Sequence, residues 1–163
     1  MKLTVKQLSR AAVIAALYVA LCFFLKPISF GVIQFRISEV LCVLPIFMPE
    51  AIPGLFIGCV ISNLFGGASV VLVDALLGSA TTLLAAYLTR LIYKDTKNFY
   101  LSLMPPVMLN AFIVGSYLPF IYMQDTLSVF VVLWSILNVF ISEAIVIFLL
   151  GYPLAKALSK IKF

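Results

Sequence analysis

The chain has 163 residues, of which 64% are hydrophobic and 10% are charged, and it carries a formal net charge of +5. Soluble domains are about 45–50% apolar and about 25% charged, so this composition indicates an integral membrane protein with no room for a soluble domain. The sequence has no His and no phosphate-binding loop of the GxxxxGK[ST] or GxGxxG type. We therefore expect no catalytic residue, no metal site, no cofactor and no ATP hydrolysis by this chain alone.

The first apolar run covers residues 11–25. No small-residue cleavage site follows it, so we interpret it as a retained transmembrane helix and not as a signal peptide. Ala12, Ala16 and Ala20 recur on one face of this helix at intervals of four residues. Small residues at this spacing let another helix approach closely within lipid. The pattern alone leaves open whether that helix belongs to this chain or to a separate subunit.

A polar segment, FGVIQFRISEVL, follows at residues 30–41. One interpretation is local: Ser38 caps the next helix, and Arg36 pairs with Glu39 one turn later. The alternative is that the segment covers a pocket, in which Phe35 stacks on a flat ligand while Arg36 and Glu39 form hydrogen bonds with it. Both interpretations stay open at this point.

The next apolar run, 37–65, is interrupted by three prolines and an acid, Pro45, Pro49, Glu50 and Pro53. Proline removes a helical hydrogen-bond donor, and a charge at the centre of a bilayer is costly. We therefore predict two short helices here in place of one long helix. Gly54 and Gly58 form a small-residue seam in the second helix, for which we favour packing within the chain. Asn63, near the end of that helix, is typical of a helix cap.

Three further apolar runs, 70–91, 101–122 and 127–154, contain isolated polar residues. A carboxylate near a helix centre costs about 2.5–3.5 kcal/mol on insertion scales, so an acid there is expected to face a cavity or a partner. Asp74 fits this description, and it shares a helix face with Gly78 and Thr81. We expect Asp74 to contact a ligand near the outer surface.

The last run contains a second acid, Glu143, which lies roughly 140° around the helix from Asn138 at 100° per residue. Two interpretations therefore remain open for Glu143. The first is ligand binding. The second is a role deep in the membrane, either at a helix contact or in a proton relay. Asn110 is interpreted as a hydrogen-bonding residue between helices. Tyr117 and Trp134 are candidates for stacking on a ligand.

The basic residues favour six spans. Splitting the run 37–65 gives six transmembrane helices with both termini in the cytoplasm, and it leaves Lys26 and Arg36 as the basic residues outside. This distribution follows the positive-inside rule, whereas five spans would separate the two basic termini. The predicted fold is thus an all-α, multi-pass bundle in the cell membrane, with residues 1–163 forming a single domain.

Several segments together resemble the queuosine-precursor transporter family. They are GVIQFRISE at 31–39, VLPIFMPEAIPGLFIGCVISN at 43–63, Asp74 with GSAT at 78–81, and EAIVIFLLGYPL at 143–154. The resemblance implies a substrate-binding S component of an energy-coupling-factor (ECF) transporter, which works with a transmembrane coupling subunit and two ATPase subunits. It also implies that Ala12 and Ala16 contact the coupling subunit, and it implies no nucleic-acid partner.

The ligand that the resemblance implies is a 7-deazaguanine base, which is flat, has N–H donors on one edge and, in one precursor, carries a cationic aminomethyl arm. A carboxylate can accept hydrogen bonds from the ring N–H and the exocyclic amine together, and a second carboxylate can neutralise the arm. From this chemistry we predict that the ligand is contacted by Phe35, Arg36, Glu39, Asp74, Tyr117, Trp134, Asn138 and Glu143. The alternative function is a small proton-coupled or homodimeric secondary transporter or exporter, with Glu143 as the proton-linked acid.

Overall fold

The computed structural model describes residues 4–30, 34–66 and 71–161, and within these ranges it contains helices and no strands. Among the described residues, four helical stretches are long and apolar enough to cross a membrane, Val5–Phe24, Asp74–Thr96, Phe99–Tyr122 and Val129–Leu158. Two shorter apolar helices, Ile37–Ile46 and Ala51–Gly66, lie in the proline-interrupted run. The predicted division of that run is therefore confirmed.

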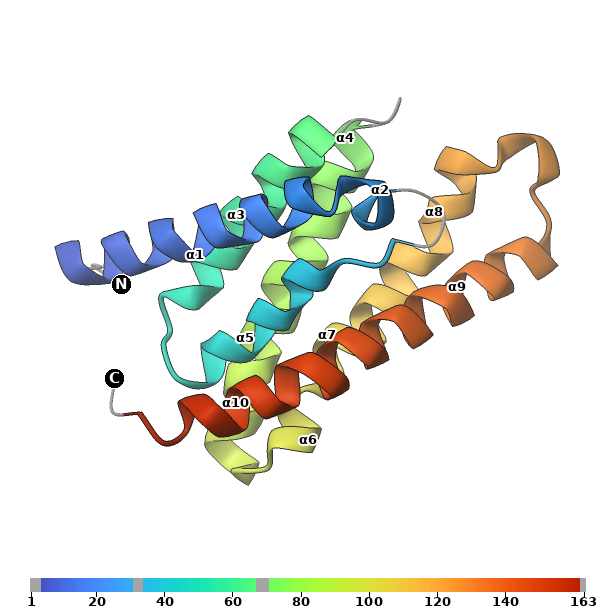
Figure 1. Ribbon diagram of the computed structural model, residues 1–163. Coiled ribbons are helices and arrows are strands. Elements are labelled where there is room, and N and C mark those ends of the chain that lie inside the picture. Colours follow the sequence, from blue (N-terminus) through green and yellow to red (C-terminus); the bar gives the residue numbers. More distant parts are fainter. Residues whose placement is uncertain (1–3, 31–33, 67–70, 162–163) are drawn as a thin grey trace.

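The helices run back and forth along the molecule, and the two termini lie at the same end (Figure 1). The first half of the chain comprises α1 (Val5–Phe24), α2 (Lys26–Ser29), the 3₁₀ helix η1 (Ile37–Ile46) and α3 (Ala51–Gly66). A side-chain bond from Arg10 of α1 to Glu50, 3.0 Å long, holds the turn between η1 and α3 beside the start of α1.

Each of the three long stretches in the second half contains a π-helical segment. The first consists of α4 (Val71–Val73), η2 (Asp74–Gly78) and α5 (Ser79–Thr96). The second consists of α6 (Phe99–Ser102), α7 (Met104–Leu109), η3 (Asn110–Val114) and α8 (Gly115–Tyr122). After the short η4 (Gln124–Thr126), the third consists of α9 (Val129–Ala144), η5 (Ile145–Gly151) and α10 (Tyr152–Leu158).

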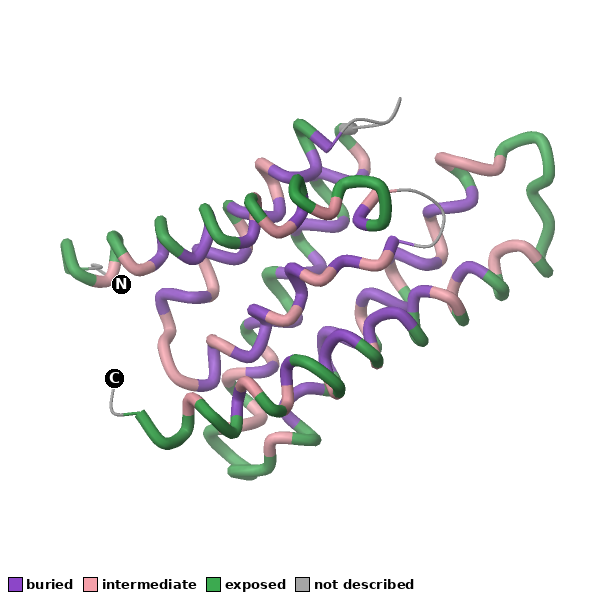
Figure 2. The backbone as a smooth tube through the Cα atoms, in the orientation of Figure 1, coloured by how far each residue is buried: buried purple, intermediate pink, exposed green. Residues whose placement is uncertain are grey.

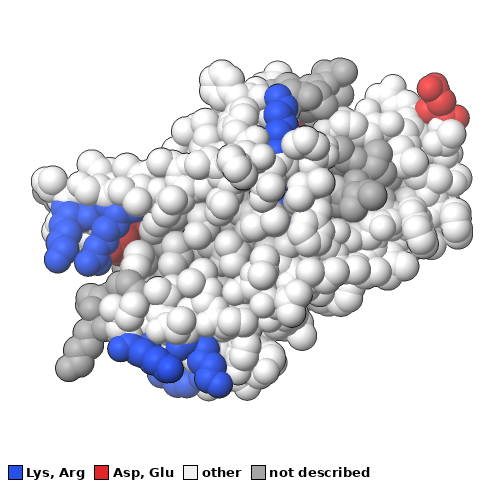
Figure 3. All heavy atoms as spheres, in the orientation of Figure 1, with Lys and Arg blue, Asp and Glu red and all other residues white. Residues whose placement is uncertain are grey.

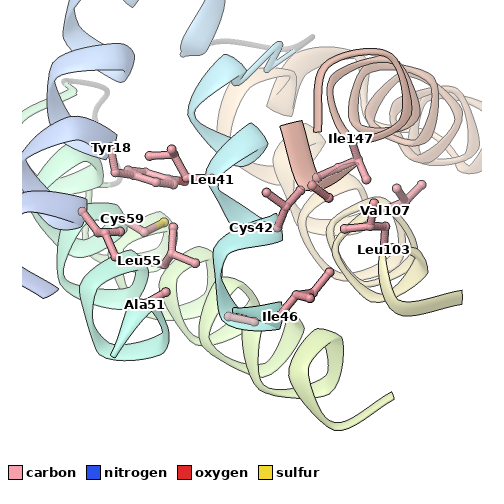
Figure 4. Close-up of a cluster of buried hydrophobic side chains, with 14 of the residues drawn as sticks. Tyr18, Leu41, Cys42, Ile46, Ala51, Leu55, Cys59, Leu103, Val107 and Ile147 are labelled. Atoms are coloured by element: carbon pink, nitrogen blue, oxygen red, sulfur yellow. The ribbon is translucent and has the colours of Figure 1, made fainter. Parts of the chain in front are cut away.

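The 3₁₀ helix η1 lies at the centre of the bundle, where it packs against α1, α5 and η5. Figure 4 shows Cys42 and Ile46 of η1 among core side chains of the surrounding helices. A 3₁₀ helix rises about 2.0 Å per residue, so these ten residues span about 20 Å, against about 15 Å for an α-helix of the same length. Pro45 lies inside this helix, and its missing N–H is one fewer donor to satisfy within the apolar core.

Small residues let α1 and α3 approach closely. A Cβ atom added to Gly54 would lie 2.7 Å from the backbone oxygen of Ala11, and one added to Gly58 would lie 2.8 Å from Cβ of Tyr18. The packing of Gly54 and Gly58 within the chain is thus confirmed. On the α1 side, this contact uses the buried Ala11 and Ala15.

The other alanines of α1 do not take part in that contact. Ala12, Ala16 and Ala20 are exposed, and Figure 2 shows α1 with one buried and one exposed edge. These three alanines line an apolar groove of about 550 Å³, together with Ile57 and Ile61 of α3. The face that the sequence left ambiguous is therefore free of packing within the described part of the chain.

Candidate functional site

A buried ion pair joins the segment before η1 to the start of η2. Nη2 of Arg36 donates to Oδ2 of Asp74 at 2.9 Å, and both side chains are buried. The pairing of Arg36 with Glu39 that the spacing suggested is therefore wrong. The two residues are joined through the backbone, where the Glu39 N–H donates to the Arg36 oxygen at 3.1 Å, but their side chains bond to different partners.

Asp74 is the hub of a wider hydrogen-bond network. Its Oδ1 accepts a bond of 2.5 Å from the Tyr117 hydroxyl of α8, and its Oδ2 accepts a bond of 3.5 Å from the Gln34 amide. Its backbone oxygen accepts a bond of 2.8 Å from the Asn63 amide of α3. Asn63 therefore does more than cap a helix: it ties α3 to the π-helical turn that carries the carboxylate. Segments far apart in the sequence thus converge on one acid.

Two glycines leave room around this network. A Cβ atom on Gly78 would lie 3.0 Å from Oδ1 of Asp74 and 3.1 Å from the Tyr117 hydroxyl oxygen. A Cβ atom on Gly66 would collide with the ring of Phe30. That ring in turn lies 5.6 Å from the Arg36 guanidinium, a cation–π distance.

The backbone before Arg36 is in an uncommon conformation. Gln34 has a φ of 42°, which places a residue other than glycine in the left-handed region, and its side chain is buried. Such a conformation costs on the order of 1–3 kcal/mol and persists where the surroundings fix it, often at functional sites. Here it accompanies the bond from Gln34 to Asp74.

Glu39 lies deeper in the bundle, on η1. One carboxylate oxygen accepts a hydrogen bond from the Tyr18 hydroxyl of α1, and the other accepts one from Sγ of Cys42 at 2.9 Å. The predicted capping role of Ser38 is wrong, since no side chain caps η1 and the Ser38 hydroxyl lies 3.0 Å from Sγ of Cys22. The local interpretation of residues 36–39 therefore fails, because each polar side chain bonds to another element.

Glu143 is buried at mid-length of the helical stretch that begins at α9, with an exposed fraction of 4%. The charges that act on it come from Glu39 and Arg36, and Asn110 of η3 lies beside it. Among the described residues, neither Oε2 of Glu143 nor Nδ2 of Asn110 has a hydrogen-bond partner of good geometry. Glu143 thus lies in the polar interior near Glu39 and Arg36, and Asn110 is not fully used as a bond between helices.

The remaining predicted site residues lie elsewhere. Trp134 is 55% exposed, and Asn138, which is only partly buried, donates 2.9 Å to the backbone oxygen of Trp134 on its own helix. Phe35 is half-buried, and its backbone N–H bonds to the oxygen of Ile28 at 2.8 Å. The structure thus gathers Arg36, Glu39, Asp74, Tyr117 and Glu143, but it does not bring Trp134 or Asn138 to them.

Four residues of the cluster were missed by the analysis of the sequence: Tyr18, Phe30, Gln34 and Asn63. Tyr18 is a polar group in an alanine-rich helix, and Gln34 lies within the motif that carries the family resemblance. Those two features were available signals. No local signal distinguished Asn63 from a helix cap, or Phe30 from Phe35 as the aromatic partner.

The arrangement offers acceptors on carboxylates and donors on guanidinium, amide and phenol groups, most of them buried and Tyr117 partly so. Within residues 4–30, 34–66 and 71–161, no group of three or more Cys, Asp and Glu residues is placed to hold a metal ion. Groups of these kinds are suited to recognise a small polar molecule by charge-assisted hydrogen bonds.

Two comparisons with known proteins found a match. A family model described as QueT transporter matches residues 8–160. The curated protein "Queuosine precursor transporter QueT" of Lactococcus lactis subsp. cremoris (strain MG1363) is 40% identical over 91 residues, which are 55% of this chain and 52% of that relative. The match therefore spans about half of the relative's length. No solved structure matches the chain significantly.

Proposed function

Because this chain belongs to the QueT transporter family, and is therefore a multi-pass membrane protein, we propose that it binds a queuosine precursor, a 7-deazaguanine base, for uptake across the cell membrane. In this proposal it is the substrate-binding S component of an ECF-type transporter. The relative from Lactococcus lactis is named as a queuosine precursor transporter. The energy would come from two ATPase subunits through a transmembrane coupling subunit, since the sequence contains no phosphate-binding loop.

The buried Asp74–Arg36 pair is the observation that supports substrate binding most strongly. A guanine-type edge presents a ring N–H and an exocyclic amine next to a carbonyl oxygen. A carboxylate accepts from the first two, and a guanidinium donates to the third. Asp74 and Arg36 supply both groups side by side, and Tyr117 and Gln34 are further polar partners around the carboxylate. We propose that ligand takes over part of this network, with Phe35 contributing contact area.

The exposed alanine face of α1 supports a separate coupling subunit. Ala12 and Ala16 border an apolar groove that no described part of the chain fills. In lipid, helices associate where small residues permit close approach. We propose that a transmembrane helix of the coupling subunit occupies this groove, and that the bound S component reorients against that subunit to release its ligand inside.

The proposal includes six crossings with both termini in the cytoplasm. The four long stretches and the two short apolar helices supply six candidate segments. For the shortest, ten residues of 3₁₀ helix cover about 20 Å of the roughly 30 Å thickness of the hydrocarbon core, and the non-helical residues 34–36 before it add to that length. Its backbone needs no contact with lipid, because η1 is surrounded by other helices.

A secondary transporter is the alternative. The buried Glu143 favours it, since acids in the membrane interior often take part in proton-coupled transport. Under that alternative, the purified chain alone would move its substrate in response to a proton gradient. The ECF proposal requires instead that the chain alone binds substrate but does not transport it.

Two measurements test the proposal. Purified protein is titrated with 7-deazaguanines, with guanine, and with thiamine and riboflavin as unrelated ligands; we expect binding of at least one 7-deazaguanine and no binding of the two vitamins. The same protein in liposomes is then assayed for uptake alone and with a coupling subunit and ATPases. If no deazaguanine binds, the substrate assignment fails, and if the chain alone transports with a proton gradient, the ECF assignment fails.

A further inference from the structure

The buried polar cluster contains more acid than base. Asp74, Glu39 and Glu143 are all buried, and Arg36 is the buried cation among them. The other buried acid, Glu50, is paired with Arg10 at the end of the molecule where both termini lie, and it does not belong to the cluster. Three carboxylates and one guanidinium leave a formal excess of two negative charges when all are ionised.

No nearby lysine corrects this excess in the described part of the chain. Lys26, at the start of α2, is exposed, and its ammonium lies 5.9 Å from the ring of Phe23. Residues 31–33 and 67–70, which the structure does not describe, have no ionisable side chain in the sequence. A buried carboxylate is expensive unless it is paired with a cation and hydrogen-bonded.

Glu143 is the least satisfied of the three acids. Asp74 accepts bonds from Arg36, Gln34 and Tyr117, and Glu39 accepts bonds from Tyr18 and Cys42. By contrast, Oε2 of Glu143 accepts no hydrogen bond from the described residues, although Glu143 is only 4% exposed. The neighbouring amide of Asn110, 5% exposed, is likewise unpartnered at Nδ2.

We propose that the site selects a ligand with a protonated amine, and that Glu143, with Glu39 and Asn110 beside it, holds that amine while the base edge binds at Asp74. This inference rests on the proposed function and narrows it: among 7-deazaguanines, the site prefers those with a cationic aminomethyl arm. Glu143 is then a specificity-determining residue rather than a proton carrier. The bound cation offsets one of the two excess charges.

The chemistry of the arm explains the preference. An ammonium group has three N–H donors and a positive charge, so it satisfies Oε2 of Glu143 by a charge-assisted hydrogen bond. A nitrile at the same position only accepts hydrogen bonds, and it would leave the carboxylate unpaired. A hydroxymethyl arm is nearly the same size as the aminomethyl arm and can donate, but it carries no charge. These ligands therefore separate the effect of charge from that of shape.

The experiment is a titration of the purified full chain with 7-aminomethyl-, 7-hydroxymethyl- and 7-cyano-7-deazaguanine. We expect the aminomethyl base to bind about 10- to 100-fold more tightly than the hydroxymethyl base, the range of a charge-assisted bond to a buried group. In Glu143→Gln, this preference should collapse, while affinity for the cyano base stays near that of the wild type. Glu50→Gln is the matched control, because it removes a buried acid outside the cluster and should keep the preference.

Three outcomes are distinguishable. If the three bases bind equally to the wild-type protein, or if Glu143→Gln weakens all of them alike, the inference is overturned and the proposed function stands. If none of them binds, the proposed function itself fails. If Glu143→Gln does not fold, the comparison of aminomethyl and hydroxymethyl bases in the wild-type protein still decides whether charge is recognised.

Discussion

At the scale of single residues, the Arg36–Asp74 pair carries both stability and recognition. Inserting a carboxylate into an apolar helix costs about 2.5–3.5 kcal/mol, and the guanidinium offsets that cost at 2.9 Å. Removing one partner of a buried pair leaves the other unpaired, which typically costs about 3–5 kcal/mol, whereas removing both is far less harmful. A variant of either residue alone therefore changes two properties at once.

Asp74→Asn tests this dual role. We expect the single variant to lower the melting temperature of the ligand-free protein, because Arg36 stays buried without its counter-charge. We also expect ligand affinity to fall by about one to two decades, since a charge-assisted bond is replaced by a weaker one. The double variant Arg36→Gln with Asp74→Asn should regain stability but not affinity. Melting temperature and dissociation constant are measured on the same preparation.

The double variant also separates recognition from a purely structural role. Wild-type affinity in a double variant that melts normally would remove both residues from the ligand site. The control is Arg10→Gln with Glu50→Gln, which deletes a second ion pair of the described residues, near the start of α1. These two substitutions together should leave the dissociation constant of the ligand unchanged.

Much of the site was predictable from which residues are polar, but their pairing was not. The cost of a carboxylate in an apolar run identified Asp74 and Glu143 as interior residues, and both are buried. The partner of Arg36 was not predicted, because one interpretation paired it with Glu39 three residues away and the other with a ligand, whereas the observed contact joins residues 38 apart. Trp134 was proposed for its ring alone, and nothing in the sequence showed that its side of α9 is exposed.

At the scale of elements, irregular helices position the polar groups. Asp74 begins η2, Asn110 begins η3, and Glu143 lies two residues before η5. A π-helical turn accommodates one extra residue and shifts the faces that follow, and such turns are frequent at functional sites. In the predicted stripe, Thr81 and Thr82 both bond back to oxygens four residues earlier, and it is Thr82 that also reaches Sγ of Cys59 of α3. Regular periodicity cannot anticipate such a change of register.

Ala16→Trp tests the groove on α1. The position is exposed, so we expect the variant to fold and to bind ligand with unchanged affinity. The indole would fill the groove that we propose for the coupling subunit, so co-purification with that subunit should be lost. Leu133→Trp, on the exposed side of α9, is the matched control and should assemble normally. Normal assembly of Ala16→Trp would show that this face contacts lipid and not the coupling subunit.

At the scale of the whole molecule, the basic residues gather at the end that the chain topology places in the cytoplasm under the proposal. Figure 3 shows most of the visible Lys and Arg gathered toward the end where the termini lie. The Arg10–Glu50 bond holds the proline-rich turn at the same end. Composition was enough to predict an all-helical membrane protein, and three prolines with Glu50 were enough to predict a divided second run. The 3₁₀ form of η1 was not predictable, because it depends on the helices that surround it.

Cysteine labelling tests the topology. The three native cysteines are buried, so a membrane-impermeant thiol reagent should react mainly with introduced ones. Asp95→Cys lies at the end of α5 and Asp125→Cys in η4, both at exposed positions. Six crossings from a cytoplasmic N-terminus predict labelling of Asp125→Cys in intact cells, and of Asp95→Cys only after the membrane is permeabilised.

Five crossings reverse both expectations. If residues 37–66 crossed once, every later segment would run in the opposite direction, and Asp95→Cys would be outside while Asp125→Cys would be inside. An inverted bundle with six crossings would give this same reversed pair, so Thr4→Cys, at the exposed start of α1, is needed to distinguish the two. It should be protected in intact cells for either a five- or a six-crossing chain with a cytoplasmic N-terminus, and labelled if the bundle is inverted. Six crossings therefore predict that Thr4→Cys and Asp95→Cys are protected and that Asp125→Cys is labelled. In that case the break between η1 and α3 adds one crossing, and this crossing brings the basic C-terminus back to the cytoplasm.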